Sequence, residues 1–133
     1  MTLAPRSNLS ASPSLLDRLG GEGAIECAVP LFYEKVLRDP LVAPFFKALD
    51  MRAQVRKLIG FMTCAFGGQS GYSGRDLRSA HKRLVQLHGL SDAHFDAVAG
   101  HLQATLSELG IPESLIAECL VLVGSLRDEV LDR

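Results

Sequence analysis

Tryptophan is absent from this 133-residue chain, and only 6% of its residues are aromatic. Cysteine is nearly as rare. Cys27, Cys64 and Cys119 include no Cys-x-x-Cys pair and leave one thiol over in any disulfide scheme. A disulfide framework and a cysteine-ligated metal site are therefore not indicated, and a reducing compartment is the simpler assumption. We expect the three thiols to pack as small hydrophobes.

Net charge and long apolar runs are also lacking. The formal charge is −1 and the pI is near 6.4, which gives no electrostatic footprint for nucleic acid. The longest apolar stretch, 115–126, is interrupted by Glu118 and falls short of the roughly 20 residues that cross a membrane. The sequence therefore predicts neither a nucleic-acid partner nor a membrane partner. A hydrophobic content of 47% fits one globular domain with a sizeable core.

The first 13 residues are rich in serine, alanine and proline, with one arginine and no acid. This composition is typical of a disordered tail and, more weakly, of an organelle transit peptide. We therefore expect a disordered tail over 1–13 and one folded domain over 14–133. We also expect a cytoplasmic location, with targeting to an organelle left open.

The rest of the chain contains helical periodicity. Apolar residues recur at the spacing of one helix face, and no strand pattern competes with them. Pro30 lies inside the second apolar stripe and predicts a kink or an offset start there. The fold class is therefore all-α, with helices expected over 14–19, 25–37 and 50–67, over a short segment around His81, and over 95–109 and 115–130.

Two polar residues interrupt one of these apolar stripes. Gln54 and Lys57 share a helix face with Phe61, Met62 and Ala65. Lys57 either runs its methylene stem along apolar surface and keeps its ammonium in water, or turns inward to meet a group in the core. The stripe alone leaves both interpretations open.

A histidine occupies an apolar position further along the chain. His81 lies in register with Leu77, Leu84 and Val85 on the expected short helix. It is either a core histidine whose ring nitrogens have hydrogen-bond partners or a neutral imidazole that faces a metal or a heme iron. In the second case an acceptor orients its other nitrogen. Three neighbouring cations would suit the carboxylates of a heme, although a solvated basic face also explains them: Arg78, Lys82 and Arg83.

Several short motifs follow one another along the chain: Leu19-Gly20-Gly21, Phe32-Tyr33, Pro44-Phe45-Phe46, Phe61-Met62-Thr63 followed by 65–68, Gly74-Arg75, the run from Arg78 to His81, and the run from Asp92 to Asp96. In this order and spacing they resemble the group I truncated hemoglobins, small heme globins with a two-over-two helical sandwich. The resemblance runs from about residue 14 to residue 133. The glycine-rich stretch 67–74 lies where that family replaces an ordinary globin helix by extended chain.

The resemblance implies a non-covalent heme b. His81 matches the proximal histidine that binds the iron, and Tyr33 and Gln54 match the distal residues that hydrogen-bond a bound gas. Certain relatives attach the heme covalently to a histidine of the last helix, but this chain has no histidine after His101. Arg78 is a candidate partner for a heme carboxylate. The residues expected to form the apolar pocket are Phe46, Leu58, Phe61, Met62, Leu77, Leu90, Phe95 and Val98.

Lys57 occupies a distal position that varies within the family. Some members, particularly algal ones, use a lysine here as the sixth iron ligand, which requires a neutral amine and would be lost as the pH falls. In the other outcome Lys57 reaches outward to a heme carboxylate. We expect ligation because Gln54, Lys57 and Phe61 share the inward stripe, where the amine would otherwise be a buried cation beside the iron.

The function implied is that of a heme protein that binds diatomic gases, namely oxygen and nitric oxide. The leading hypothesis is a nitric oxide dioxygenase that an unidentified external reductase returns to the ferrous state, with Lys57 as a displaceable iron ligand. Two alternatives stay open: an oxygen or nitric oxide sensor that reports ligand exchange to a partner, and an electron carrier in which Lys57 never dissociates. We expect a monomer, because no large apolar face is left unexplained.

Overall fold

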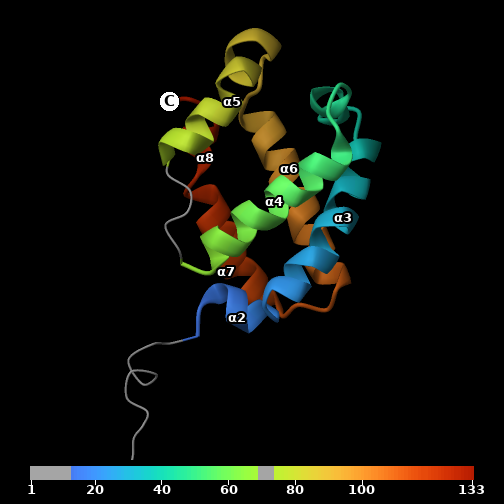
Figure 1. Cartoon of the computed structure of the whole chain (residues 1–133), viewed down its shortest axis with the longest axis vertical. Helices are drawn as coiled ribbons and strands as arrows, with labels where there is room; N and C mark the ends of the chain where they lie inside the picture. The colour runs from blue at the N-terminus through green and yellow to red at the C-terminus, as the bar shows by residue number, and fades with distance from the viewer. Residues whose placement is uncertain (1–12, 69–73) are drawn as a thin grey trace, which may run out of the picture.

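The computed structural model describes residues 13–68 and 74–133, and every regular element in these ranges is a helix (Figure 1). The all-α prediction is confirmed. The predicted tail, apart from Pro13, and the middle of the glycine-rich stretch lie outside the described residues. In chain order the elements are α2 (Leu15–Leu19), α3 (Glu22–Arg38), the 3-10 helix η1 (Ala43–Phe46), α4 (Met51–Phe66), α5 (Gly74–His88), α6 (Asp92–Glu108), α7 (Glu113–Gly124) and α8 (Arg127–Val130).

The helix ends follow local side-chain chemistry. Asp50 accepts hydrogen bonds from two backbone amides in the first turn of α4, and Ser14 and Ser91 cap α2 and α6 in capping boxes. Gly20 ends α2 with a φ of 116°, in the left-handed region that favours glycine. Gly67 directly follows the last residue of α4. These signals are local, which is why the sequence predicts most boundaries closely.

The two-over-two arrangement is centred on α3. This helix packs against α4 in one layer and against α6 in the other, where α6 pairs with α7 (Figure 1). Leu102 and Leu106 of α6 and Ile116 of α7 join the same core. Each such side chain stabilises the fold by about 1.5–3 kcal/mol when fully buried. The buried side chains of α3 are Ile25, Ala28, Val29, Phe32, Tyr33 and Val36.

Pro30 lies inside α3, which continues on both sides of it. Of the two predicted outcomes, the offset start is wrong, because the helix begins at Glu22, well before the proline, and the kink stays a prediction. Pro30 itself is exposed, whereas Ile25 and Val29 are almost completely buried. The burial of this first half of the helix offsets the cost of about 3 kcal/mol that an internal proline imposes.

The three thiols differ in burial. Cys119 is fully buried, and burial raises the pKa of its thiol to about 11, so it packs as a small hydrophobe as predicted. Cys64 is half-buried, and Cys27 is exposed. The expectation for Cys27 is therefore wrong, because it falls on the solvent side of α3 and not on its apolar stripe.

The helix that carries His81 is longer than expected and lies at the edge of the fold. α5 has 15 residues, so the predicted short helix is wrong in length, because the polar turns around the stripe from Leu77 to Val85 show no apolar pattern. Within the described residues its extensive contacts are with α8, which lies beside it in Figure 1, and not with α4 or α6. None of the helices in the described part of the chain has the length and apolar composition needed to cross a membrane.

Candidate functional site

His81 lies in the middle of α5 with its imidazole half-buried. Its Nδ1 is 2.8 Å from the carbonyl oxygen of Leu77, one turn earlier, and donates a hydrogen bond to it. A neutral imidazole that donates from Nδ1 keeps a lone pair on Nε2, which is the form that binds a metal. No three His, Cys, Asp or Glu side chains converge in residues 13–68 and 74–133 to hold a metal ion.

Tyr33 and Gln54 meet between α3 and α4. The side-chain amide of Gln54 donates a hydrogen bond of 3.2 Å to the hydroxyl oxygen of Tyr33. The ring of Tyr33 is 5% exposed and packs edge-on against Phe32 and Phe46. Burial raises the pKa of Tyr33, and the hydrogen bond from Gln54 opposes that rise only in part. The phenol is therefore protonated at neutral pH, and its own proton is available for a further acceptor.

The predicted apolar pocket residues fall into two groups by burial. Met62 and Leu77 are buried. The other six retain part of their apolar surface in contact with solvent, in contrast to the fully covered face of α3. Uncovered apolar surface on three helices can be covered by a further apolar group. The six half-buried residues are Phe46, Leu58 and Phe61 from η1 and α4, and Leu90, Phe95 and Val98 from the start of α6 and the turn before it.

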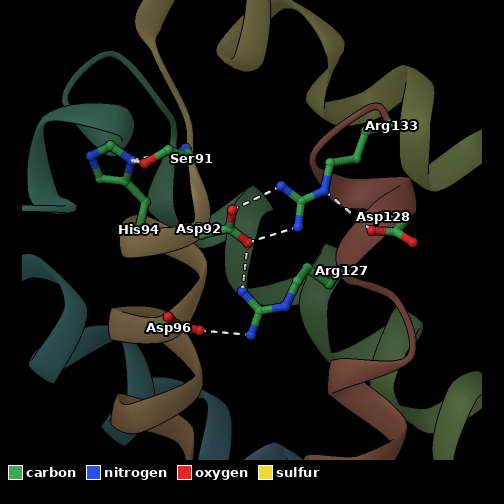
Figure 2. Close-up of polar contacts among 7 residues, drawn as sticks. All are labelled: Ser91, Asp92, His94, Asp96, Arg127, Asp128 and Arg133. Atoms are coloured by element: carbon green, nitrogen blue, oxygen red, sulfur yellow. Dashed lines mark hydrogen bonds and ion pairs between the residues drawn. The ribbon is translucent and has the colours of Figure 1, made fainter.

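An ion-pair network holds the C-terminal residues on the first turns of α6 (Figure 2). Asp92 accepts hydrogen bonds of 2.8 Å from both terminal guanidinium nitrogens of Arg133 and of 2.9 Å from Arg127, and Arg127 also pairs with Asp96 at 2.7 Å. These contacts hold the pKa of Asp92 below its usual range, Arg133 contributing most. The guanidinium of Arg127 lies 4.5 Å from the ring centroid of Phe95, a predicted pocket residue. Sequence reasoning missed this network because its partners are 31 to 41 residues apart.

Arg78 is directed toward the end of the chain. One guanidinium nitrogen lies 3.3 Å from a carboxylate oxygen of Asp132 and 3.4 Å from the carbonyl oxygen of Arg133. This contact ties α5 to the C-terminal residues. The assignment of Arg78 to a heme carboxylate stays a prediction, and such a carboxylate would compete with Asp132 for the same guanidinium.

Lys57 is exposed, although Gln54 and Phe61 on the same stripe are half-buried. Its ammonium makes no hydrogen bond or ion pair with any residue that the structure describes. In this arrangement Lys57 lies at the outer edge of the stripe. Its role as an iron ligand stays a prediction.

Two further histidines have structural partners. Nδ1 of His94 accepts a hydrogen bond from the Ser91 backbone amide, and its ring packs edge-on against Phe45 at 4.9 Å. Nε2 of His101 lies 2.7 Å from a carboxylate oxygen of Asp39, joining α6 to the end of α3. That hydrogen bond is the main reason that the pKa of Asp39 is lowered. We assign neither histidine as a ligand of the heme iron.

Comparison with known proteins identifies the family. Residues 14–132 match the bacterial-like globins. The chain is also 49% identical over 112 residues to the group 1 truncated hemoglobin GlbN of Synechocystis sp., covering 84% of this chain and 90% of that protein. The chain belongs to the group 1 truncated hemoglobins. As a member of this family, the truncated hemoglobin described here is a heme protein that binds diatomic gases such as oxygen.

Solved structures agree with this assignment. The 2/2 hemoglobin of Synechococcus sp. PCC 7002, with covalently attached heme, superimposes with a TM-score of 0.85 at 46% identity, covering 90% of this chain and 99% of that one. The Chlamydomonas reinhardtii protein THB1 gives a TM-score of 0.79 at 48% identity, covering 90% and 98%. The two-over-two fold predicted for this chain is therefore confirmed.

Proposed function

We propose that this truncated hemoglobin is a nitric oxide dioxygenase that holds a non-covalent heme b through Nε2 of His81. The orientation of the His81 ring by Leu77 supports this assignment, because an iron-binding histidine needs its other nitrogen fixed by an acceptor. The half-buried apolar residues of η1, α4 and α6 would cover the faces of the ring system. When bound, the heme supplies an iron that binds a diatomic gas and changes oxidation state.

The observation that carries the proposal is the hydrogen bond from Gln54 to Tyr33. Because Gln54 donates to the hydroxyl oxygen, the proton of Tyr33 is free to be donated to an oxygen atom of the captured gas. The buried position of Tyr33 makes that hydrogen bond stronger than it would be in water. Gln54 acts as a positioning residue that restricts the rotation of the Tyr33 hydroxyl.

The overall reaction sets the requirement for a partner. Nitric oxide and dioxygen together contain the atoms of nitrate, and one added electron supplies its negative charge. The protein therefore needs one electron from an external reductase for each nitric oxide consumed. We place this reaction in a cytoplasmic monomer.

Lys57 is proposed as the displaceable distal ligand. It lies three residues after Gln54 on α4 and has no competing partner among the described residues, so its flexible side chain can turn toward the iron. Replacing Lys57 by alanine should convert a low-spin ferric absorption spectrum to a high-spin one. Replacing Lys47, which is exposed outside the stripe, should leave the spectrum unchanged. Identical spectra for wild type and Lys57→Ala would remove Lys57 from the iron.

The test of the proposed function is the yield of nitrate from nitric oxide in air-saturated buffer with a chemical reductant present. We expect one nitrate per nitric oxide over many turnovers. Tyr33→Phe and Gln54→Leu should each lower the rate, by roughly 10- to 100-fold for loss of the phenol proton. Gln86→Leu, a matched change at an exposed position of α5, should keep the wild-type rate. Gas binding without nitrate formation would overturn the dioxygenase assignment.

A further inference from the structure

The charge of this chain is divided between two parts of the sequence. Residues 47–88 contain eight lysines and arginines but two acids, a net charge of +6, whereas the remaining residues contain six cations and thirteen acids, a net charge of −7. The two values sum to the overall −1. The near-neutral total therefore conceals a strongly basic central segment, which comprises α4 and α5.

Most of the described cations of this segment are exposed and have no acidic partner among the described residues. The side chains of these exposed cations make no hydrogen bond or ion pair with the residues that the structure describes. Arg78, which binds Asp132, is the exception among the described cations of this segment. Of the other six, Lys57 is assigned to the iron in the proposed function, so we call the remaining five the α4–α5 cation face: Lys47, Arg52, Arg56, Lys82 and Arg83.

Elsewhere the described cations are paired with carboxylates. Arg18 pairs with Glu118, Lys35 with Glu108 and Arg38 with Glu34, while Arg127 and Arg133 share the network of Figure 2. An unpaired, exposed cation keeps its full charge available to a partner approaching through water. The α4–α5 cation face is thus a region of uncompensated positive charge.

This face borders the candidate heme site. α4 contributes Gln54, and α5 contributes His81, which are two of the polar groups assigned to the site. In Figure 1 the N-terminal half of α4 and the C-terminal half of α5 both lie in the upper part of the molecule. A heme brings two carboxylates, which would neutralise two of the five cations at most. A positive surplus therefore remains beside the group that must receive an electron.

We propose that the α4–α5 cation face docks an acidic electron-transfer protein, which supplies the electron that the proposed function requires. In the transfer the reduced flavin of the donor loses one electron and the iron passes from ferric to ferrous, with no bond made or broken in either protein. A compact acidic protein can cover the face alone. An extended polyanion such as a membrane or a nucleic acid is disfavoured, because the chain as a whole carries −1 and the residues outside this segment carry −7.

The experiment measures reduction of the heme-loaded full chain by a reduced flavodoxin, used as an acidic probe, under anaerobic stopped-flow conditions at low salt. Two variants each remove two charges from the face: Arg52→Gln/Arg56→Gln and Lys82→Gln/Arg83→Gln. The matched control, Arg18→Gln/Arg38→Gln, removes two exposed charges from the paired part of the chain. Dithionite, a small reductant, reports whether each heme site is intact.

We expect the second-order rate constant to fall about tenfold in each face variant and less than twofold in the control. In wild type it should also fall as salt is raised toward 0.5 M, since screening acts over a Debye length of about 10 Å at 0.1 M. Reduction by dithionite should be equal in all four proteins. Equal slowing in face and control variants, or a rate independent of salt, would overturn the proposal.

Two further results separate the alternatives. Face-dependent binding to phosphatidylserine vesicles, with flavodoxin reduction unaffected by the same substitutions, would assign the face to a membrane and overturn the docking of a protein. Failure to form nitrate with a chemical reductant, together with charge-dependent reduction by flavodoxin, would overturn the proposed dioxygenase function while supporting the docking surface.

Discussion

In one region of this molecule, the paired region, cations form ion pairs with carboxylates. In another, the unpaired region, cations have no such partner. Around α2, α6, α8 and the C-terminal end of α3, cations meet carboxylates, and the apolar face of α3 is covered by neighbouring helices. On α4 and α5, five exposed cations have no acidic partner in the described residues, and apolar side chains such as Phe61 and Leu84 are only half-buried.

We interpret the paired region as the structural scaffold and the unpaired region as the binding site. The core around α3 and the ion pairs around α6 and α8 are complete without any further component, since these apolar and charged groups find partners within the chain. The inner faces of α4 and α5 leave apolar surface that a heme can cover, and their outer faces leave charge that a partner can neutralise. Stability should therefore depend on the first region, and ligand-dependent order on the second.

The largest expected effect is on the unpaired region when heme is added. Any ligand present at a thousand times its Kd adds about 4 kcal/mol to the free energy of unfolding. Hydrogen exchange should show the greatest gain of protection in α4 and α5, with smaller gains in α3 and α6. His81→Ala should remove the gain, whereas His88→Ala, an exposed histidine on the same helix, should retain it. Uniform protection of all helices would break the comparison.

The second largest effect is expected when an ion-pair network of the paired region is disrupted. Asp92→Ala deprives Arg127 and Arg133 of their shared carboxylate, so the C-terminal residues lose their attachment to α6. The melting temperature, followed by circular dichroism, should fall by several degrees. Arg56→Ala removes a charge that has no described partner and should leave the melting temperature unchanged. Equal shifts in the two variants would contradict the distinction between the regions.

Acid should weaken the paired region selectively. The pKa values of Asp92, Asp39 and Glu118 are lowered by their hydrogen-bonded cationic or histidine partners. Carboxylates with lowered folded-state pKa values stabilise the fold above their unfolded values of about 4, and this contribution is lost as the pH falls through the folded values. Urea unfolding should thus show constant stability from about pH 7 to pH 5 and a decline below about pH 4.

Two variants sharpen this acid test. Asp92→Asn removes one titrating carboxylate from the network and should reduce the decline of stability below about pH 4. Arg52→Gln/Arg56→Gln, on the α4–α5 cation face, changes no group that titrates in this range and should reproduce the wild-type profile. An unchanged acid slope in Asp92→Asn would exclude this carboxylate as a source of the decline.

The smallest effect concerns two threonines. The hydroxyl of Thr63 on α4 is buried without a hydrogen-bond partner in the described residues, whereas that of Thr105 on α6 donates to the carbonyl oxygen of His101 at 2.8 Å. Thr63→Val should raise the free energy of unfolding by about 1 kcal/mol, because a buried hydroxyl without a partner is costly. Thr105→Val should lower it by about 1 kcal/mol, because a made hydrogen bond is lost. Denaturant unfolding at neutral pH measures both, and equal signs would contradict the expectation.

Most of the fold could be predicted from local patterns. The caps at Ser14, Asp50 and Ser91 and the apolar stripes define the helices through interactions within a few residues. The motif order indicated the family, which the comparisons confirm. The offset start at Pro30 was wrong, because a proline's local cost says nothing of the core contacts that keep the helix continuous.

The site was only partly predictable in the same way. Tyr33 and Gln54 are 21 residues apart, and the family resemblance was needed to bring them together in advance. The pairing of Arg78 with Asp132, 54 residues away, had no signal in spacing or composition. Long-range ion pairs between exposed side chains leave no periodic pattern in a sequence, so they become visible only when the helices are packed.

By itself, the sequence determined the helical elements, their caps, the family and the uneven division of charge, because each of these depends on residue types at short or fixed spacings. Only the tertiary structure decided which cations are neutralised and which are not, that Lys57 lies at the exposed edge of its stripe, and that Leu77 orients the ring of His81. The physical reason is that pairing, exposure and ring orientation depend on how folding packs the helices together and sets each side chain among its neighbours.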